Sequence, residues 1–336
     1  MSRTIKFAKA GGPEVLEFIE TQVPAPGPHE VRIKVKAIGI NRGEAMWRND
    51  KFVKNNGPVF DPIRFPAGLG YEAAGIVDAV GKDVTGFAVG DAVSVIPAVS
   101  MNQYPTYGEV ILFPDYAVVK HPESLSFAEA ASIWMMFITA YGALIADAKV
   151  TKGDFVIIPA ASSSIGLAAI QITNYAGATP IALTRTSTKK KQLLEAGAAH
   201  VIATEEQDLV AEVMRITNGN GARVAFDPVV GPTFSKLISA LANQGIVYIY
   251  GALSEGDTQI PVLAFYPKMA TIKGYGLFQI TLDDARRKFA VEYIVKGLAS
   301  GALKPVIDRT FKFDEMVEVH RYLESNGQVG KIVVTV

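Results

Sequence analysis

The chain has 336 residues, which is too long for one ordinary hydrophobic core and predicts two domains. Apolar residues make up 49% of it and charged residues 20%, values typical of a globular protein rather than a disordered or fibrous one. Lysine plus arginine and aspartate plus glutamate number 33 each. No overall field therefore attracts nucleic acid or an anionic membrane surface, and we expect neither as a partner.

Export and membrane insertion are not indicated by the sequence. The first residues, MSRTIKFAKAGG, carry charges where a signal peptide needs a continuous apolar run, and the chain contains no cysteine. The longest apolar stretch, residues 131–146, falls short of the roughly 20 residues of a membrane helix. We expect a buried helix there and a cytoplasmic protein.

The first 125 or so residues are predicted to be mostly β. Residues 29–40 alternate apolar and basic side chains, which is the period of a half-buried strand. Further short strands are predicted at 75–80, 91–96 and 116–120, separated by glycine and proline turns.

After Pro122 the pattern changes to alternating helices and strands. A helix is predicted over the segment SFAEAASIWMMFITAYGALIADA, with Ser126 as N-cap and Glu129 completing a capping box. Strands are then predicted at 155–159, 180–184, 200–203, 223–227, 245–251 and 271–277. Helices are predicted between them at 167–177, 189–198, 208–219 and 233–244.

Strand and helix in this order predict a doubly wound parallel sheet with helices on both faces. The alternation stops near residue 280, and a helix (282–300), a strand around Thr310, a helix (314–325) and a terminal strand KIVVTV remain. This tail could complete the N-terminal domain. The sheet would then be inserted between two parts of the other domain.

A dinucleotide site is predicted in the segment FVIIPAASSSIGLAAIQI, where a turn of small residues joins a buried strand to a helix. The glycine positions of the GxGxxG pattern hold Ala161, Ser163 and Gly166. Gly166 allows helix and strand to pack closely, whereas a side chain at Ser163 crowds the approach of the pyrophosphate. The alternative is a strand-to-helix turn with a serine N-cap that binds nothing. The predicted cofactor loop is Ser162, Ser163, Ser164, Ile165 and Gly166.

The segment TRTSTKKK, residues 184–191, favours NADP(H) over NAD(H). NAD enzymes present an acidic residue to the ribose about 20 residues after the loop, and this chain has none there. Arg185 can instead bind a 2′-phosphate or stack on adenine, and Thr184 and Thr186 can donate hydrogen bonds. Lys189, Lys190 and Lys191 open a surface helix and could simply be solvated.

Neither a zinc site nor a hydrolytic triad is predicted. The four histidines lie far apart in the sequence, in contexts typical of surface or strand-edge residues, and no GxSxG motif is present. Hydride transfer without a metal remains. It requires a substrate whose developing anion needs no Lewis acid, such as a quinone or an enone.

Taken together, seven motifs resemble the zinc-independent medium-chain dehydrogenases/reductases, specifically the quinone oxidoreductase and enone reductase branch. They are VRIKVKAIGIN (31–41), GLGYEAAGIVDAVG (68–81), GFAVGDAV (86–93), LSFAEAA (125–131), TAYGAL (139–144), AASSSIGLAAIQI (160–172) and GKIVVTV (330–336). The resemblance implies a GroES-like β-rich catalytic domain of residues 1–126 and 281–336 around a Rossmann NADP(H)-binding domain of residues 127–280. It also implies a homodimer through the edge strand TIKGYGL.

The resemblance further implies roles for individual residues. Asn41 would lie at the cleft position used for substrate and nicotinamide ribose, and Lys190 would contact the 2′-phosphate. The nicotinamide end and the remaining cofactor wall would be formed by Thr139, Gly251, Ala252, Leu253, Phe278 and Lys331.

Three positions depart from the family pattern: Ser163 in the loop, Met46 where relatives often carry tyrosine, and Tyr71 where many have threonine or histidine. A tyrosine can donate a proton or orient a carbonyl oxygen, so we expect Tyr71 to act with Asn41 as a catalytic group. Met46, Trp47 and Phe278 are expected to bind substrate. Simple core packing is the alternative for Met46, Trp47 and Tyr71. The insertion 52–66 is expected to form a lid.

The leading hypothesis is therefore NADPH-dependent reduction of a small molecule, a quinone or an activated alkene. Two alternatives stay open. One is a protein of this fold that binds NADPH without catalysis, favoured by Ser163, and the other is a zinc-type alcohol dehydrogenase.

Overall fold

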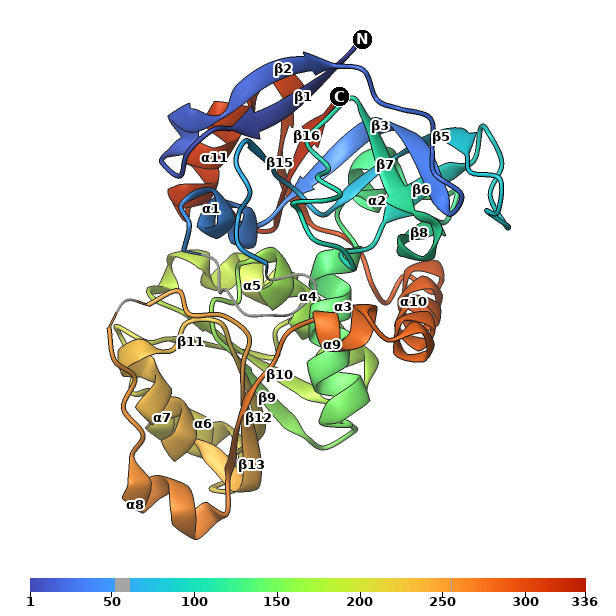
Figure 1. Cartoon of the computed structure of the whole chain (residues 1–336). Coiled ribbons are helices and arrows are strands. Elements are labelled where there is room, and N and C mark those ends of the chain that lie inside the picture. The colour runs from blue at the N-terminus through green and yellow to red at the C-terminus, as the bar shows by residue number, and fades with distance from the viewer. Residues whose placement is uncertain (52–60, 255) are drawn as a thin grey trace. The chain divides into compact units, whose positions relative to one another are not determined.

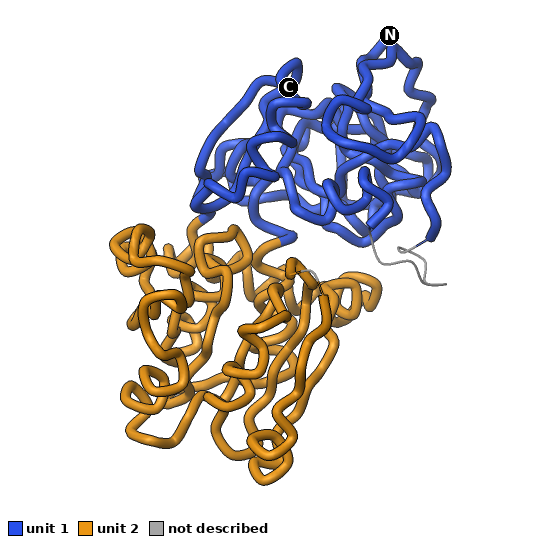
Figure 2. The backbone as a smooth tube through the Cα atoms, turned by 90° about the vertical axis from the view of Figure 1, so that its left-hand side faces the viewer, with its two compact units in different colours: residues 1–135, 305–336 blue, residues 136–304 orange. Residues whose placement is uncertain are grey.

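The computed structural model describes residues 1–51, 61–254 and 256–336. The chain divides into two compact units (Figure 2), which are unit 1, Met1–Met135 with Pro305–Val336, and unit 2, Met136–Lys304. Unit 1 combines both chain ends, and unit 2 is one continuous segment. Residues 281–304 lie in unit 2 rather than with the chain ends. One reason is that the Tyr293 ring packs against Tyr141 and Tyr175, with centroids 4.9 and 5.1 Å apart.

Unit 1 is built mainly of antiparallel strands (Figure 1). Its larger sheet has the order β15-β16-β3-β5-β6-β8, and β7 also pairs with β3. These strands are β3 (Glu30–Ile40), β5 (Ala73–Val80), β6 (Ala92–Val95), β7 (Val110–Pro114), β8 (Val118–Lys120), β15 (Ile307–Lys312) and β16 (Lys331–Thr335). A smaller sheet contains β1 (Ser2–Phe7), β2 (Glu17–Thr21) and β4 (Ala67–Gly68).

The strand predicted at 29–40 is confirmed as β3, whose apolar side chains are buried while its basic side chains are not. The C-terminal strand β16 pairs antiparallel with β3, so that Ile332 lies opposite Ile40. The end of the chain thus adds strands to the same sheet as β3. The helices of unit 1 are α1 (Arg42–Arg48), α2 (Phe127–Ala130) and α11 (Met316–Glu324).

Unit 2 contains the predicted parallel sheet, with the strand order β11-β10-β9-β12-β13-β14. The strands are β9 (Phe155–Ile158), β10 (Thr179–Thr184), β11 (His200–Ala203), β12 (Ala222–Asp227), β13 (Leu241–Ile249) and β14 (Thr271–Gly274). Within this sheet the first strand in sequence is β9. The next two, β10 and β11, extend the sheet to one edge, and the chain then crosses back to β12 on the other side of β9. In a doubly wound sheet, right-handed crossovers on the two sides of such a reversal place the helices on opposite faces. The predicted doubly wound fold is confirmed.

The helices of unit 2 begin with α3 (Trp134–Tyr141), whose first two residues belong to unit 1. They continue with α4 (Ser164–Tyr175), α5 (Lys190–Glu195), α6 (Leu209–Ile216), α7 (Phe234–Ser239), α8 (Val262–Phe265), α9 (Phe278–Thr281) and α10 (Asp284–Ala299). α4 packs on β9 and β10, whereas α6 and α7 pack on each other and on β11 and β13.

Several predicted boundaries are wrong. The helix predicted after Ser126 is interrupted: α2 ends at Ala130, α3 begins at Trp134, and a π-helix follows over Gly142–Asp147. The start of α3 at Trp134 is favoured because the Glu72 carboxylate accepts the Met135 N–H at 3.0 Å, which satisfies a backbone donor in the first turn of the helix. The capping box of Ser126 and Glu129 is confirmed.

The ends of three other elements also differ from the prediction. The helix predicted over 233–244 stops at Ser239, and the residues from Leu241 belong to β13. The strand predicted at 271–277 ends at Gly274, and that predicted at 116–120 begins at Val118. In each case pairing with a neighbouring strand, which local sequence does not encode, sets the boundary.

Candidate functional site

Three segments that hold most of the predicted cofactor residues follow strands of the unit 2 sheet. Strands β9, β10, β12 and β13 run parallel, so their carboxyl ends meet at one edge of this sheet. The loop 160–166 follows β9, residues 184–190 follow β10, and residues 251–253 follow β13. The strand order reverses between β9 and β12, and ligands of open α/β sheets bind outside such a reversal.

Gly166 occupies a position that only glycine fits. A Cβ atom there would lie 2.6 Å from the Ala160 carbonyl oxygen and 2.7 Å from the Ala161 Cα. Ala160 itself takes the left-handed backbone conformation, with φ of 47°. Gly166 thus lets α4 begin close to the loop that follows β9.

Ser163 is the N-cap of α4. Its Oγ accepts the Gly166 N–H at 3.1 Å, and the backbone amides of Ser164 and Ile165 remain at the helix N-terminus. Ser162, Ser163, Ser164 and Ile165 are all half-buried. A capped, partly open helix N-terminus is suited to an anion such as a pyrophosphate, although Ser163 satisfies one of its amide groups.

The segment after β10 contacts the cofactor loop through Lys189. The Lys189 Nζ lies 3.4 Å from the Ser162 Oγ, and the Ala161 N–H donates to the Leu183 carbonyl. Thr184 is half-buried, while Arg185 and Thr186 are exposed. One carboxylate is also close, because Glu206 accepts the Ser187 N–H at 2.8 Å.

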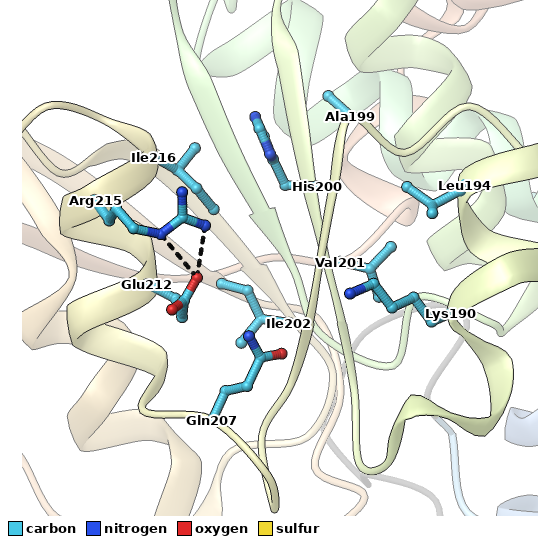
Figure 3. A pocket seen from close by; sticks show the side chains of 10 residues that line it. All are labelled: Lys190, Leu194, Ala199, His200, Val201, Ile202, Gln207, Glu212, Arg215 and Ile216. Carbon is cyan, nitrogen blue, oxygen red and sulfur yellow. Dashed lines mark hydrogen bonds and ion pairs between the residues drawn. The ribbon is translucent and has the colours of Figure 1, made fainter.

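Lys190, which the resemblance assigned to the 2′-phosphate, lines a different cavity (Figure 3). This cavity of about 190 Å³ lies between α5, β11 and α6, and its wall includes His200, Gln207 and the ion pair of Glu212 with Arg215. Sequence alone could not choose between the consecutive lysines 189 and 190. The turn of 3₁₀ helix over Ser187–Lys189 decides which side chain reaches the loop.

The segment after β13 is held against the loop that follows β12. Leu253 donates its N–H to the Pro228 carbonyl at 3.0 Å, and a Cβ on Gly251 would lie 3.0 Å from the same oxygen. Ala252 and Leu253 are exposed. Thr139 is buried in α3, and Phe278 begins α9 four residues after β14 ends.

In unit 1, Asn41 is held by a buried ion pair. The Lys331 ammonium donates to the Asn41 Oδ1 at 2.5 Å and to the Glu72 Oε2 at 2.6 Å. The Asn41 Nδ2 donates to the Gly39 carbonyl at 3.2 Å and to Glu72 at 3.3 Å. Both Lys331 and Glu72 are within 1% of complete burial, so this pair is shielded from water. Lys331, predicted to line the cofactor, thus contacts Asn41 directly.

A second buried series of hydrogen bonds ends at the backbone N–H of Asn41. Glu44 Oε2 accepts the Asn41 N–H and the Tyr107 hydroxyl, both at 2.8 Å. The Tyr107 hydroxyl is also 3.1 Å from the His320 Nε2, and the His320 Nδ1 is 2.5 Å from Arg48. The expectation that His320 is an ordinary surface residue is wrong, because it is fully buried. The apolar neighbours of His320 on α11 were the available signal.

The proposed substrate residues lie around α1 in different environments. Trp47 is 2% exposed and donates its indole N–H to the Gly68 carbonyl at 3.3 Å, which favours the core-packing alternative for this residue. Met46 is half-buried. Tyr71 is buried, and its burial together with the charges of Glu44 and Glu72 raises its pKa well above the usual value. Its phenol therefore keeps its proton at neutral pH.

The predicted lid, residues 52–66, falls mostly on residues 52–60, which lie outside the described residues. Asp61, in its described part, accepts hydrogen bonds from Ser100 at 2.5 Å and from Asn102 at 2.8 Å. Among the described residues, no group of three or more His, Cys, Asp or Glu side chains could hold a metal ion. No helix within residues 1–51, 61–254 and 256–336 has the length and apolar character to cross a membrane.

Two family descriptions match the chain. Residues 27–123 match the alcohol dehydrogenase GroES-like domain, and residues 164–291 match the zinc-binding dehydrogenase family. A human quinone oxidoreductase is 30% identical over 99% of this chain and 98% of its own length.

Solved structures show the same similarity. The Escherichia coli quinone oxidoreductase complexed with NADPH matches with a TM-score of 0.87 and 28% identity over the whole of both chains. A structure described as an NAD-dependent alcohol dehydrogenase also matches with a TM-score of 0.87, at 31% identity over 99% of each chain.

The predicted fold class, a Rossmann sheet inserted into a GroES-like β-rich domain, is confirmed by these matches together with the two sheets described above. Identity of 30% across almost the full length of a relative extends the agreement from the fold to the family. The chain belongs to the quinone oxidoreductase branch of the medium-chain dehydrogenases/reductases, a family of oxidoreductases.

Proposed function

We propose that this oxidoreductase uses NADPH to reduce a quinone or an activated alkene such as an enone. The observation that carries the cofactor assignment is the contact of the cationic segment after β10 with the cofactor loop, through Lys189 and Ser162. Arg185 stands exposed beside it where NAD enzymes present a carboxylate. The E. coli relative bound to NADPH supports the same choice.

The residues present fit a dinucleotide. Gly166 removes the Cβ that would collide with the Ala160 carbonyl, and α4 presents the amides of Ser164 and Ile165 toward an anion. Arg185 and Lys189 would hold the 2′-phosphate, with Thr184 and Thr186 as further donors. Lys190 stays a weaker proposal because it lines the cavity beside α6.

When bound, the nicotinamide supplies a hydride, so reduction of a quinone or an enone also consumes one proton. Asn41 would orient the reacting groups from a fixed position, since Lys331 and Glu72 hold its amide. Tyr71 would orient the substrate oxygen by donating a hydrogen bond to it, because its phenol stays protonated at neutral pH. Met46 and Phe278 are proposed to contact the substrate.

The first experiment measures NADPH binding. Arg185→Glu is expected to weaken NADPH affinity by tenfold or more while leaving NADH affinity nearly unchanged, because only NADPH carries the 2′-phosphate. Lys191→Glu is the matched control, since it reverses a charge on the same segment at a side chain that is 88% exposed. Equal losses for both variants, or for both cofactors, would contradict the assignment.

The second experiment measures NADPH oxidation with a panel of quinones and enones. Turnover with at least one of them is expected from the folded protein. Binding without turnover would instead support an NADPH-binding protein that lacks catalysis. Stoichiometric, tightly held zinc in the purified protein would favour the alcohol dehydrogenase alternative.

We also propose that the protein forms a homodimer through β14. This strand is an edge of the unit 2 sheet. Large apolar side chains lie exposed just before it in sequence, with Val262 at 61%, Leu263 at 85%, Tyr266 at 65% and Met269 at 67% exposure. Unpaired strand edges and contiguous apolar surface are features that a second copy would cover.

A further inference from the structure

The buried hydrogen bonds that link Arg48, His320, Tyr107 and Glu44 have a fixed donor-to-acceptor direction. Arg48 is always a donor, so the His320 Nδ1, 2.5 Å away, must be the acceptor and the Nε2 must carry the ring proton. The Nε2–H then donates to the Tyr107 oxygen at 3.1 Å, and the Tyr107 hydroxyl donates to Glu44. Every donor in this series of hydrogen bonds therefore points toward the Glu44 carboxyl.

Charge is unevenly compensated in this network. Lys331 pairs with Glu72, and Arg48 pairs with Glu324, at 2.6 and 2.7 Å. Glu44 is completely buried and forms no ion pair within residues 1–51, 61–254 and 256–336. Its Oε1 also has no hydrogen-bond partner there. Because an isolated buried carboxylate is costly, this environment favours the protonated form of Glu44.

We propose that Glu44 is a positioning residue whose ionised carboxylate fixes the backbone of Asn41, so that protonation of Glu44 loosens Asn41 and lowers turnover. The carboxylate accepts the Asn41 N–H at 2.8 Å, while the Lys331 and Glu72 pair holds the side-chain amide of the same residue. The consequence for turnover rests on the proposed function, in which Asn41 orients the reacting groups. The link from Glu44 to Asn41 does not.

Burial raises the pKa of Glu44 to about 7, and the hydrogen bonds from Asn41 and Tyr107 and the charge of Lys331 oppose this rise. Both protonation states are therefore populated near neutral pH. His320 stays neutral in the same range, since burial and Arg48 lower its pKa to about 3. The titratable and charged groups around Glu44 come from several elements: Arg48 (α1), Tyr71 and Glu72 (between β4 and β5), Tyr107 (between β6 and β7), His320 and Glu324 (α11), and Lys331 (β16).

The decisive measurement is an NMR titration of the ligand-free protein labelled with ¹⁵N-asparagine. The Asn41 amide signal is expected to titrate with a midpoint near pH 7. Glu44→Gln should abolish this titration. Tyr107→Phe removes one hydrogen bond to the carboxylate and should move the midpoint up by about 1 to 2 pH units. Tyr322→Phe is the control, because its hydroxyl contacts Asp308 instead, and it should leave the midpoint unchanged.

The same variants are then compared in the pH dependence of kcat/KM with NADPH and a quinone. In each variant, kcat/KM should rise with pH, and the midpoint of that rise should equal the midpoint of the Asn41 amide titration. Glu44→Gln should show no such rise. Two results would overturn the proposal. One is an Asn41 amide signal that does not titrate, and the other is a pH midpoint of kcat/KM that Tyr107→Phe leaves unchanged. Titration of Asn41 in a protein without any turnover would support the positioning link and count against the proposed function alone.

Discussion

At the residue scale, Glu44 couples stability to pH. Burial raises its folded-state pKa from 4.5 to about 7, so the folded chain binds more protons than the unfolded chain between these values. The free energy of unfolding should therefore fall as pH rises through this window, by roughly 3 kcal/mol in total. Denaturant unfolding at pH 5 and pH 8 measures this loss.

Glu44→Gln should remove most of this pH dependence, because an amide does not titrate. The comparison between the two proteins, rather than either curve alone, isolates Glu44 from the other carboxyl groups. A difference that is the same at pH 5 and pH 8 would contradict the raised pKa.

At the scale of the element, α4 balances its own stability against access to its N-terminus. Ser163 caps the helix through the Gly166 N–H, and we expect its side chain to crowd the approach of a pyrophosphate. Ser163→Gly should cost only a few tenths of a kcal/mol and should tighten NADPH binding. Ser163→Ala keeps a Cβ and loses the cap, so it should cost roughly 0.5 to 2 kcal/mol without any gain in affinity. Calorimetric titration and thermal unfolding measure both quantities, and tighter binding by Ser163→Ala would show that crowding is not the cause.

At the scale of the whole molecule, the exposed apolar segment before β14 predicts the oligomeric state. Light scattering should give twice the mass of one chain. Leu263→Glu places a charge at a side chain that is 85% exposed in the single chain, and it should shift the mass toward the monomer. Phe289→Glu on α10, at a side chain that is 64% exposed, is the control and should leave the dimer intact. A monomeric wild-type protein, or equal effects of both variants, would contradict the proposal.

Local patterns in the sequence determined most of the fold. The alternation in 29–40 and the strand, turn and helix around Gly166 depend on near neighbours, and they gave β3 and the β9–α4 unit correctly. The absence of an acidic residue about 20 positions after the cofactor loop likewise favours NADP(H) from the sequence alone. Such features can be predicted because periodicity and turn chemistry are properties of a short segment.

Only the tertiary structure decided which side chains meet. Lys331 reaches Asn41 across 290 positions of sequence, and Arg48 reaches His320 across 272. No local pattern distinguishes Lys189 from Lys190, and the apolar neighbours of His320 on α11 do not show which groups it contacts. These outcomes depend on β16 pairing with β3 and on the turn after β10, because long-range packing sets burial, and burial sets which charges must find partners.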